Sequence, residues 1–367
     1  MKVLVQPGDG VAPLVQAINN AKTRVEIAIF RFDRSEVERA LVNAVARGVF
    51  VHALIAYTNR GGERNLRKLE MRLLADGVTV ARTADDLVRY HGKYMIIDRK
   101  ELHLLAFNYT YLDIDRSRSF GLIIRNPKIV QEAIKLFEAD SKRQPYTPGY
   151  PAFVVSPVNS RKQLAALIRA AKKQLLIYDP EISDPEMTRL LEERLKSGVH
   201  IRIIGRLNRK NTGLEVKKLS GTRLHTRTII RDGSQAFIGS QSLREVELSS
   251  RREVGVIFRD SKALAKLSKT FEEDWAKVEA VQPAAEEDAS PATKVAKKVA
   301  KVVAKELPPV TPVLEGVVKE IVGPESEIDL DPMAVEETVK EAVKEAVKEA
   351  VRDVVESVVE HNGLVHH

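Results

Sequence analysis

The sequence predicts an α/β protein with two similar domains in tandem. An internal repeat and an alternation of strands and helices within each copy carry this prediction. Ala21–Ile27 resembles Ala171–Ile177, and the segment that begins at Gly48 resembles the one that begins at Gly198, with the same separation along the chain. Solenoids repeat every ~20 to 50 residues, so this larger repeat indicates two whole domains. A chain of 367 residues is long enough for their cores.

Within each copy, short β-branched segments alternate with amphipathic helices. The apolar residues of one such helix have the i, i+3, i+4, i+7 spacing of packing on a sheet: Leu164, Leu167, Ile168 and Ala171. Strands are expected at Phe50–Ile55 and His200–Ile204. The alternation predicts that each domain is a mixed sheet flanked by helices.

The second helix of each copy has recognisable ends. We predict N-terminal caps at Asp33 and at Ser183, because each has a glutamate three residues later. Gly48 and Gly198 stand where a glycine commonly ends a helix. These signals place equivalent helices in the two copies.

Composition divides the chain into three parts. We predict a first domain at residues 1–149, a second at 150–281, and a tail at 282–367 rich in Ala, Lys, Val, Glu and Pro. Valines recur at every fourth position within residues 335–359, which predicts a helix supported by Glu and Lys pairs. Such a helix is either a solvated tail or the binding site of a protein partner.

Charge is divided unevenly along the chain. Residues 281–367 carry 10 Lys and Arg against 18 Asp and Glu, whereas the other 280 residues carry 49 against 33. A body this basic attracts phosphate-bearing partners, either nucleic acid or anionic lipid. No apolar stretch reaches the ~18 to 20 residues of a spanning helix, and the start lacks the apolar core of a signal peptide. We expect a cytoplasmic protein, with peripheral contact to an anionic membrane as an option.

A histidine, a cation and an aspartate recur at one spacing in the two copies. The motif H-x-[KR]-x4-D is formed by His91, Lys93 and Asp98, and again by His225, Arg227 and Asp232. Residues i and i+2 of a strand share a face, so each histidine is expected beside its cation. A cation can neutralise phosphate oxygens while an imidazole attacks phosphorus or protonates a leaving oxygen. A chance pairing on an exposed strand could explain one copy, but hardly two at matching places.

These residues resemble the signature of the phospholipase D superfamily, a duplicated His-x-Lys-x4-Asp followed by Gly-Ser-x-Asn and an acidic residue. The resemblance spans residues 2–280. It implies two α/β domains related by a pseudo-twofold axis, with both histidines at one site between them. It also implies a two-step reaction without metal or cofactor. One histidine attacks phosphorus, the other protonates the leaving oxygen, and water or an alcohol then releases the phosphohistidine.

The same resemblance implies a role for each residue of the motif. We expect His91 to be the nucleophile and His225 to be the general acid and then the general base. The groups expected to hold the phosphate oxygens are Lys93, Arg227 and Asn108. Asp98 and Asp232, which belong to the same catalytic motif, are expected to brace the site rather than to take part in the chemistry.

The two copies depart from the signature in different places. At the Ser and Asn positions, the first copy has Ala106 and Asn108 and the second has Ser240 and Ser242. The acidic position holds Ser119 in the first copy and Glu253 in the second. Two separate sites would each be incomplete, whereas one composite site keeps a nearly full set. The substrate-binding candidates are therefore Asn108, Ser240, Ser242 and Glu253.

We predict a metal-independent phosphodiesterase or phosphatidyltransferase, similar to cardiolipin synthases, with a phospholipid as the favoured substrate. Aromatic residues make up only 5% of the chain, with one tryptophan, so the stacking surfaces typical of proteins that bind single-stranded nucleic acid are not evident. Arg227 in place of lysine keeps the charge but changes the geometry, and we expect weakened activity. The alternatives are a nuclease of the same superfamily, or a non-catalytic phosphate-binding or scaffold protein.

Overall fold

The computed structural model describes residues 1–57, 63–209, 212–219 and 221–281, together with Val299, Val343 and Val347. Residues 1–278 form one compact unit, which contains both repeats. The division predicted near residue 149 stays a prediction. Of the predicted tail helix, only Val343 and Val347 are among the described residues, and both are helical. Within the described part, no helix has both the length and the apolar composition needed to cross a bilayer.

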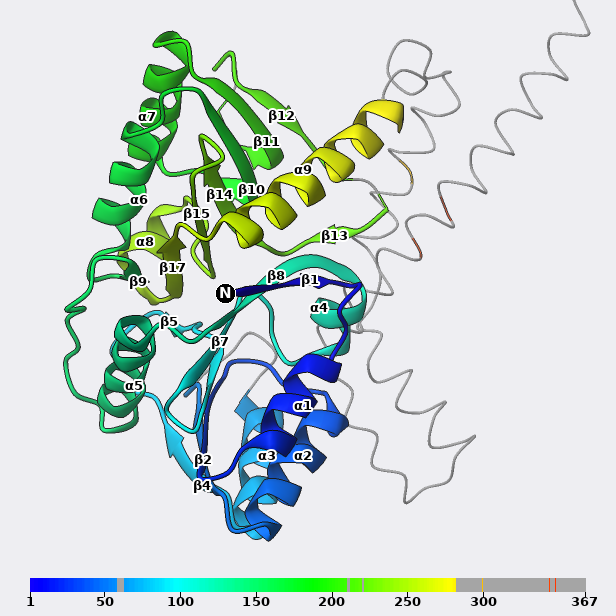
Figure 1. The fold of residues 1–367 in the computed structure, drawn as a ribbon, viewed down its shortest axis with the longest axis vertical. Helices are drawn as coiled ribbons and strands as arrows, with labels where there is room; N and C mark the ends of the chain where they lie inside the picture. The colour runs from blue at the N-terminus through cyan, green and yellow to red at the C-terminus, as the bar shows by residue number, and fades with distance from the viewer. Residues whose placement is uncertain are drawn as a thin grey trace, which may run out of the picture. The chain divides into compact units, whose positions relative to one another are not determined.

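The first repeat is a mixed sheet with helices packed on it (Figure 1). Its strands lie in the order β1-β8-β7-β6-β2-β3-β4. Their bounds are β1 Lys2–Gln6, β2 Arg24–Ile29, β3 Phe50–Ile55, β4 Thr79–Arg82, β6 Tyr94–Ile97, β7 Glu101–Leu105 and β8 Ser117–Ile124. The helices are α1 Ala12–Asn20, α2 Ser35–Ala46, α3 Glu63–Ala75, α4 Tyr111–Asp115 and α5 Pro127–Ser141.

The second repeat has the same strand order, read from the opposite end as β12-β11-β10-β14-β15-β17-β9. Its strands are β9 Phe153–Val155, β10 Gln174–Ile182, β11 His200–Leu207, β12 Glu215–Lys217, β14 Arg227–Arg231, β15 Gln235–Gly239 and β17 Val254–Phe258. Its helices are α6 Ser160–Arg169, α7 Pro185–Lys196, α8 Glu245–Ser249 and α9 Ser261–Val281. The equivalence of the strands confirms the predicted pair of α/β domains.

Three very short strands join the repeats reciprocally. β5 (Arg89–Tyr90) of the first repeat pairs with β16 (Arg251–Arg252) of the second. β13 (Arg223–Leu224) of the second repeat pairs with the start of β8 in the first. Because each repeat gives the other the same kind of contact, the arrangement is that of a two-fold relation within one chain.

Buried apolar side chains of both sheets belong to one contiguous cluster. Ile96 and Phe120 from the first sheet share it with Ile230 and Ile238 from the second. A separate cluster covers the other face of each sheet, under α1, α2 and α3 in the first repeat and under α6 and α7 in the second (Figure 1). The shared cluster therefore holds the two repeats together through apolar burial.

The predicted strand and helix ends are largely confirmed. β3 coincides with the predicted strand, and β11 begins at His200 as expected and continues to Leu207. Gly48 and Gly198 directly follow the C-terminal caps of α2 and α7, with φ values of 82° and 84°. In that left-handed region glycine avoids the strain that a side chain would cause.

The predicted N-terminal caps are wrong by one residue. Asp184, not Ser183, caps α7 by accepting a hydrogen bond from the Met187 amide, because Pro185 fixes the first helical position. Arg34 occupies the cap position of α2 without a side-chain hydrogen bond to the helix. The carboxylate of Asp33 accepts instead from the Tyr111 amide, so it joins the starts of α2 and α4.

Candidate active site

Both motif histidines lie between strands, at the boundary of the two repeats. His91 follows β5 and precedes β6, and His225 lies between β13 and β14. The His91 amide donates to the Arg252 carbonyl at 2.7 Å, and the His225 amide donates to the Arg118 carbonyl at 3.0 Å. The prediction that each histidine lies in a strand with its cation is therefore wrong, because both histidines lie outside β6 and β14. The chain leaves its own sheet here to pair with the opposite repeat.

His91 has a carboxylate partner from the second repeat. Its Nδ1 lies 2.7 Å from Glu253 Oε2, and the Phe30 ring packs edge-on against the imidazole. When Nδ1–H is donated to the carboxylate, the lone pair is on Nε2. Burial lowers the pKa of His91 well below its ordinary value, and the charges of Lys93 and Arg227 lower it further. The imidazole is thus neutral near pH 7, which is the nucleophilic form.

His225 has no equivalent carboxylate, because Ser119 stands where the other repeat has Glu253. Its Nδ1 makes no hydrogen bond to the described residues. One oxygen of Asp113 lies 3.5 Å from this nitrogen. The charges of Lys93 and Arg227 act on His225 as they do on His91, so groups from both repeats share one electrostatic environment.

The two motif cations are held differently. Lys93 is 1% exposed, and its Nζ has no hydrogen-bond partner in the described part of the chain. Burial lowers the pKa of Lys93 to about 7. Arg227 donates to the His225 carbonyl at 2.6 Å and to Ser242 Oγ at 3.2 Å. Because serine is shorter than the asparagine of the signature, Ser242 leaves room for the guanidinium and gives it an acceptor.

Two of the predicted substrate-binding residues are engaged with neighbouring groups. Asn108 Nδ2 donates to the Asp113 carboxylate at 2.6 Å, so one of its two protons is already used. Ser240 Oγ accepts from the Val254 amide at 3.1 Å. Burial raises the pKa of Glu253, against the charges of Lys93 and Arg227. Ser240 Oγ also donates to the Val254 carbonyl at 3.4 Å, so it anchors the backbone of the residue that follows Glu253.

Two acidic residues of the site were not singled out from the sequence. Asp113 on α4 and Glu247 on α8 occupy the same position of the two repeats, and both are buried. Asp113 accepts from the Asn108 amide at 2.8 Å, as Glu247 accepts from the Ser242 amide at 2.7 Å. The available signal was an acidic residue five positions after both Asn108 and Ser242.

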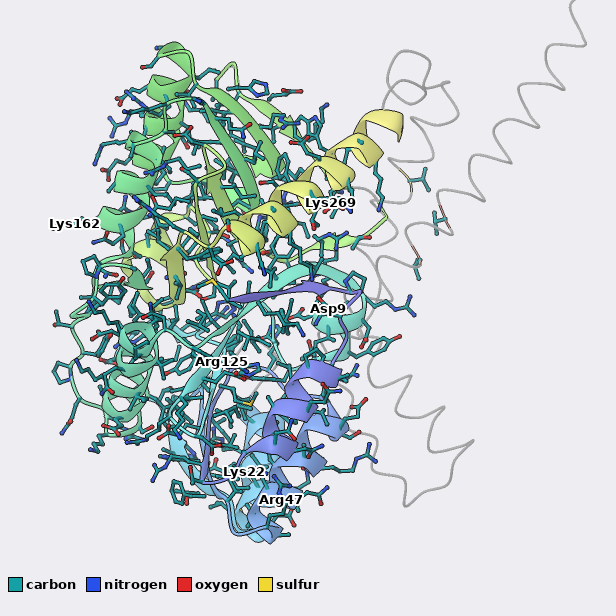
Figure 2. The ribbon with its side chains drawn as sticks, in the orientation of Figure 1. Asp9, Lys22, Arg47, Arg125, Lys162 and Lys269 are labelled. Carbon is teal, nitrogen blue, oxygen red and sulfur yellow. The ribbon has the colours of Figure 1, made fainter. Side chains whose placement is uncertain are left out.

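Asp98 and Asp232 lie at the opposite ends of β6 and β14 from the histidines, with φ values of 51° and 52°. Asp98 accepts hydrogen bonds from the backbone amides of residues 22–24, and Asp232 from those of residues 172–174. Lys22 lies at the end of the first repeat that points away from the second (Figure 2). Burial opposes ionisation of both aspartates, but these hydrogen bonds outweigh it and lower the pKa of each.

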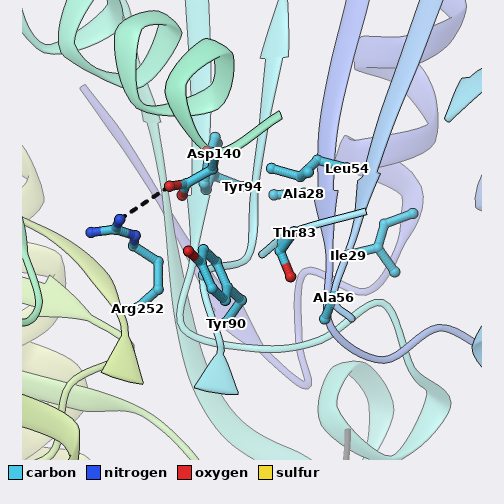
Figure 3. A pocket seen from close by; sticks show the side chains of 10 residues that line it. Ala28, Ile29, Leu54, Ala56, Thr83, Tyr90, Tyr94, Asp140 and Arg252 are labelled. Carbon is cyan, nitrogen blue, oxygen red and sulfur yellow. Dashed lines mark ion pairs between the residues drawn. The ribbon is translucent and has the colours of Figure 1, made fainter. Parts of the chain in front are cut away.

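Buried ion pairs hold the segments that cross between the repeats. Arg252 of β16 lies 3.1 Å from Asp140 of α5 (Figure 3). In the opposite direction, Arg118 of β8 donates to both oxygens of Asp274 on α9, at 2.7 and 2.9 Å. The carbonyls of these two arginines accept the amides of the motif histidines. Each pair therefore fixes one histidine segment through the other repeat.

A small cavity lies beside the pair of Arg252 and Asp140 (Figure 3). Its volume is about 20 Å³, and Thr83, Tyr90 and Tyr94 contribute to its lining. That volume suits roughly one water molecule, so the cavity is too small for a lipid head group. Among the described residues, no three His, Asp or Glu side chains gather as a metal-binding set.

Comparison with known proteins gives a family match in each repeat. The family described as cardiolipin synthase, PLD-like domain, matches residues 14–141 and 164–275. A mitochondrial cardiolipin hydrolase from Danio rerio is 27% identical over 130 residues, which are 34% of this chain and 56% of that protein. The chain therefore matches little more than half the length of this curated relative.

Two solved structures share the fold over three quarters of the chain. A polyphosphate kinase from Porphyromonas gingivalis has a TM-score of 0.63 at 18% identity, over 75% of this chain and 50% of that one. A phosphatidylserine synthase from Haemophilus influenzae has a TM-score of 0.56 at 11% identity, over 76% of this chain and 86% of that one. Since the family match covers more than half of the chain, once in each repeat, the chain belongs to the phospholipase D superfamily, in the family of the cardiolipin synthase PLD-like domain.

Proposed function

We propose that this protein is a phosphodiesterase or phosphatidyltransferase that acts through a phosphohistidine on His91. The observation that carries the proposal is a neutral, buried His91 whose Nδ1 lies 2.7 Å from Glu253. A buried Lys93 with no hydrogen-bond partner among the described residues adds a site for a phosphate oxygen. Arg227 supplies a second cation from the other repeat.

In the first step, Nε2 of His91 attacks phosphorus, the P–N bond forms, and the bond to the leaving oxygen breaks. His225 gives its proton to that oxygen. Glu253 stabilises the positive charge that develops on the His91 ring, and Lys93 and Arg227 neutralise the non-bridging oxygens. In the second step, water or an alcohol gives a proton to His225 and attacks phosphorus, which restores His91. Water yields a phosphomonoester, and an alcohol yields a new diester. Neither step of this reaction needs a metal.

A phospholipid is the favoured substrate. Support comes from the cardiolipin synthase description of the family and from the curated relative that is named a cardiolipin hydrolase. The basic body of the chain suits peripheral contact with an anionic membrane. The same charge is the observation in favour of the second candidate, a nuclease, whose affinity for DNA would fall steeply with salt.

The test is turnover of a nitrophenyl phosphodiester in excess chelator, followed by trials with anionic phospholipid vesicles and with oligonucleotides. His91→Ala is expected to lower kcat by ~10⁴ or more, because removal of a nucleophile abolishes the covalent route. The matched control is His200→Ala, at an exposed position of β11, which is expected to leave kcat unchanged. Loss of turnover in chelator, or full activity of His91→Ala, would contradict the proposal.

Samples denatured at alkaline pH assign the two histidines, because the P–N bond of a phosphohistidine hydrolyses in acid. Nitrophenolate leaves without a proton, so His225→Ala should still form the adduct but release it slowly. Mass spectrometry should then find the phosphoryl adduct accumulated on His225→Ala and absent from His91→Ala. The reverse pattern would exchange the two roles.

A further inference from the structure

We propose that Asp113 is the positioning carboxylate of His225, in the role that Glu253 has for His91. The inference rests on the proposed function, in which His225 is the acid and base. The first repeat has Ser119 where a carboxylate for His225 would stand. Asp113 belongs to the first repeat and approaches a histidine of the second, just as Glu253 belongs to the second and contacts a histidine of the first.

The contacts of Asp113 fix its position. The residue is 2% exposed. Its Oδ2 accepts from the amide and the side chain of Asn108, at 2.8 and 2.6 Å, and lies 3.5 Å from His225 Nδ1. Its Oδ1 accepts from Arg223 at 2.7 Å. A small rotation of the imidazole would bring Nδ1–H to Oδ2, and Nε2 would then point its proton or lone pair toward the substrate.

The charges around His225 favour the same assignment. Burial would raise the pKa of Asp113, but the charges of His225 and Arg223 and the bonds from Asn108 hold it well below its ordinary range, so the carboxylate is ionised. At His225, burial lowers the pKa well below its ordinary value, and Asp113 opposes this. Arg223 from β13, Arg227 from β14 and Lys93 before β6 add to the lowering. Asp113 therefore favours the protonated form of His225, which is the form that a general acid needs.

Glu247 provides the matched control because it has the same position in the second repeat without the same task. It accepts from the Ser242 amide, as Asp113 does from that of Asn108, and it pairs with Arg251 at 3.2 Å. His91 already has Glu253. The charges of Asp113 and Glu247 both raise the pKa of Lys93, and that of Glu247 also raises the pKa of His91. A variant at Glu247 therefore reports the cost of loosening this loop and of removing a nearby charge, and a variant at Asp113 reports the same costs together with the loss of the partner of His225.

The experiment compares Asp113→Asn with Glu247→Gln on two diesters, after thermal melting has shown that both variants are folded. With an alkyl leaving group, which needs a proton, Asp113→Asn is expected to lower kcat by ~10² to 10³, in line with the loss of an orienting carboxylate. The initial burst of nitrophenolate from an aryl diester should fall by less than about tenfold. Glu247→Gln should lower both rates by less than about fivefold. Equal losses in the two variants would overturn the proposal.

Two further measurements do not depend on that comparison. Ser119→Glu in the Asp113→Asn background places a carboxylate at the position equivalent to Glu253 and should recover part of the alkyl-diester rate. Nitrogen-15 NMR of the full-length chain should show a changed tautomer or protonation state at His225 in Asp113→Asn and not in Glu247→Gln. If the wild type cleaves no diester, the proposed function fails, while the NMR result still decides the pairing. An unchanged His225 spectrum in Asp113→Asn would refute the pairing of Asp113 with His225.

Discussion

The buried amine of Lys93 is expected to set an upper pH limit for the binding of an anion by the free protein. Burial lowers its pKa to about 7, and the described residues offer its Nζ no hydrogen bond. An amine with a depressed pKa is charged below that value and neutral above it, so the cation is lost as the pH rises through 7. His91 sets the lower pH limit. Because its pKa is well below 6.5, the imidazole keeps its lone pair until the pH falls well below that value.

We therefore expect kcat/KM to fall above about pH 7, by about tenfold per unit, because uncharged Lys93 binds the phosphate oxygen poorly. Lys93→Arg should move this alkaline limit up by more than about two units, since a guanidinium stays charged. Its maximal rate should be ~10- to 100-fold lower, because the planar group is displaced. A pH–rate profile of both proteins with an aryl diester is the measurement. If the alkaline limit stays at the same pH in Lys93→Arg, the limit belongs to another group.

The motif residues could be predicted from the sequence because they recur at one spacing in both copies. Asp113 and Glu247 could not, although they recur as well. They lie on five-residue helices, and Asp113 approaches its histidine across the repeat boundary. A carboxylate near a turn has many local uses, and only the assembled fold separates a residue that caps a helix from one that faces a catalytic group.

At the scale of elements, the aspartates of the motif brace the turns that follow β6 and β14. Asp98 accepts from three backbone amides and from the Thr23 hydroxyl, and so joins this turn to the start of β2. Asp232 does the same between β14 and β10. Each motif thus spans one strand. Its histidine precedes the strand, at the boundary of the repeats, and its aspartate braces the turn that follows the strand.

Asp98→Ala should lower the free energy of unfolding by about 2 to 3 kcal/mol, since several amides lose their acceptor and a residue without a polar side chain must adopt a positive φ. Asp98→Asn keeps an acceptor and should cost roughly half as much. Urea denaturation gives both values. The kcat of the folded protein should stay within about twofold of wild type. A loss above tenfold in a stable Asp98→Asn protein would place this residue in the chemistry.

Longer elements followed from periodicity, but the two-residue strands did not. β5, β13 and β16 are too short for an alternation of polar and apolar residues to be recognised. Their partners lie in the other repeat, more than 100 residues away. These strands displace the histidines from the expected strand face, so the local sequence could place the motif but not its conformation.

For the whole molecule, residues 1–278 form the compact unit that contains every residue of the candidate site. A chain that ends at Val281 should therefore hydrolyse a small aryl diester with a kcat/KM within about twofold of the full chain and melt at a similar temperature. Removing 18 acidic residues along with 10 basic ones should also strengthen binding to anionic vesicles at low salt. Steady-state kinetics and vesicle sedimentation test both points. A drop in kcat/KM above tenfold would give the tail a part in catalysis.

Each repeat supplies contacts to the histidine segment of the other, so the two halves of the chain can differ in sequence and still form one site. A symmetric dimer of the first repeat would contain Ser119 twice and no counterpart of Glu253, whereas a dimer of the second would contain Arg227 twice and no Lys93. Neither homodimer reproduces the present site. Fusion in one polypeptide fixes a one-to-one ratio of unlike halves. Under the proposed mechanism, fusion allows one histidine to specialise for attack and the other for proton transfer, whereas the two subunits of a homodimer must carry the same sequence.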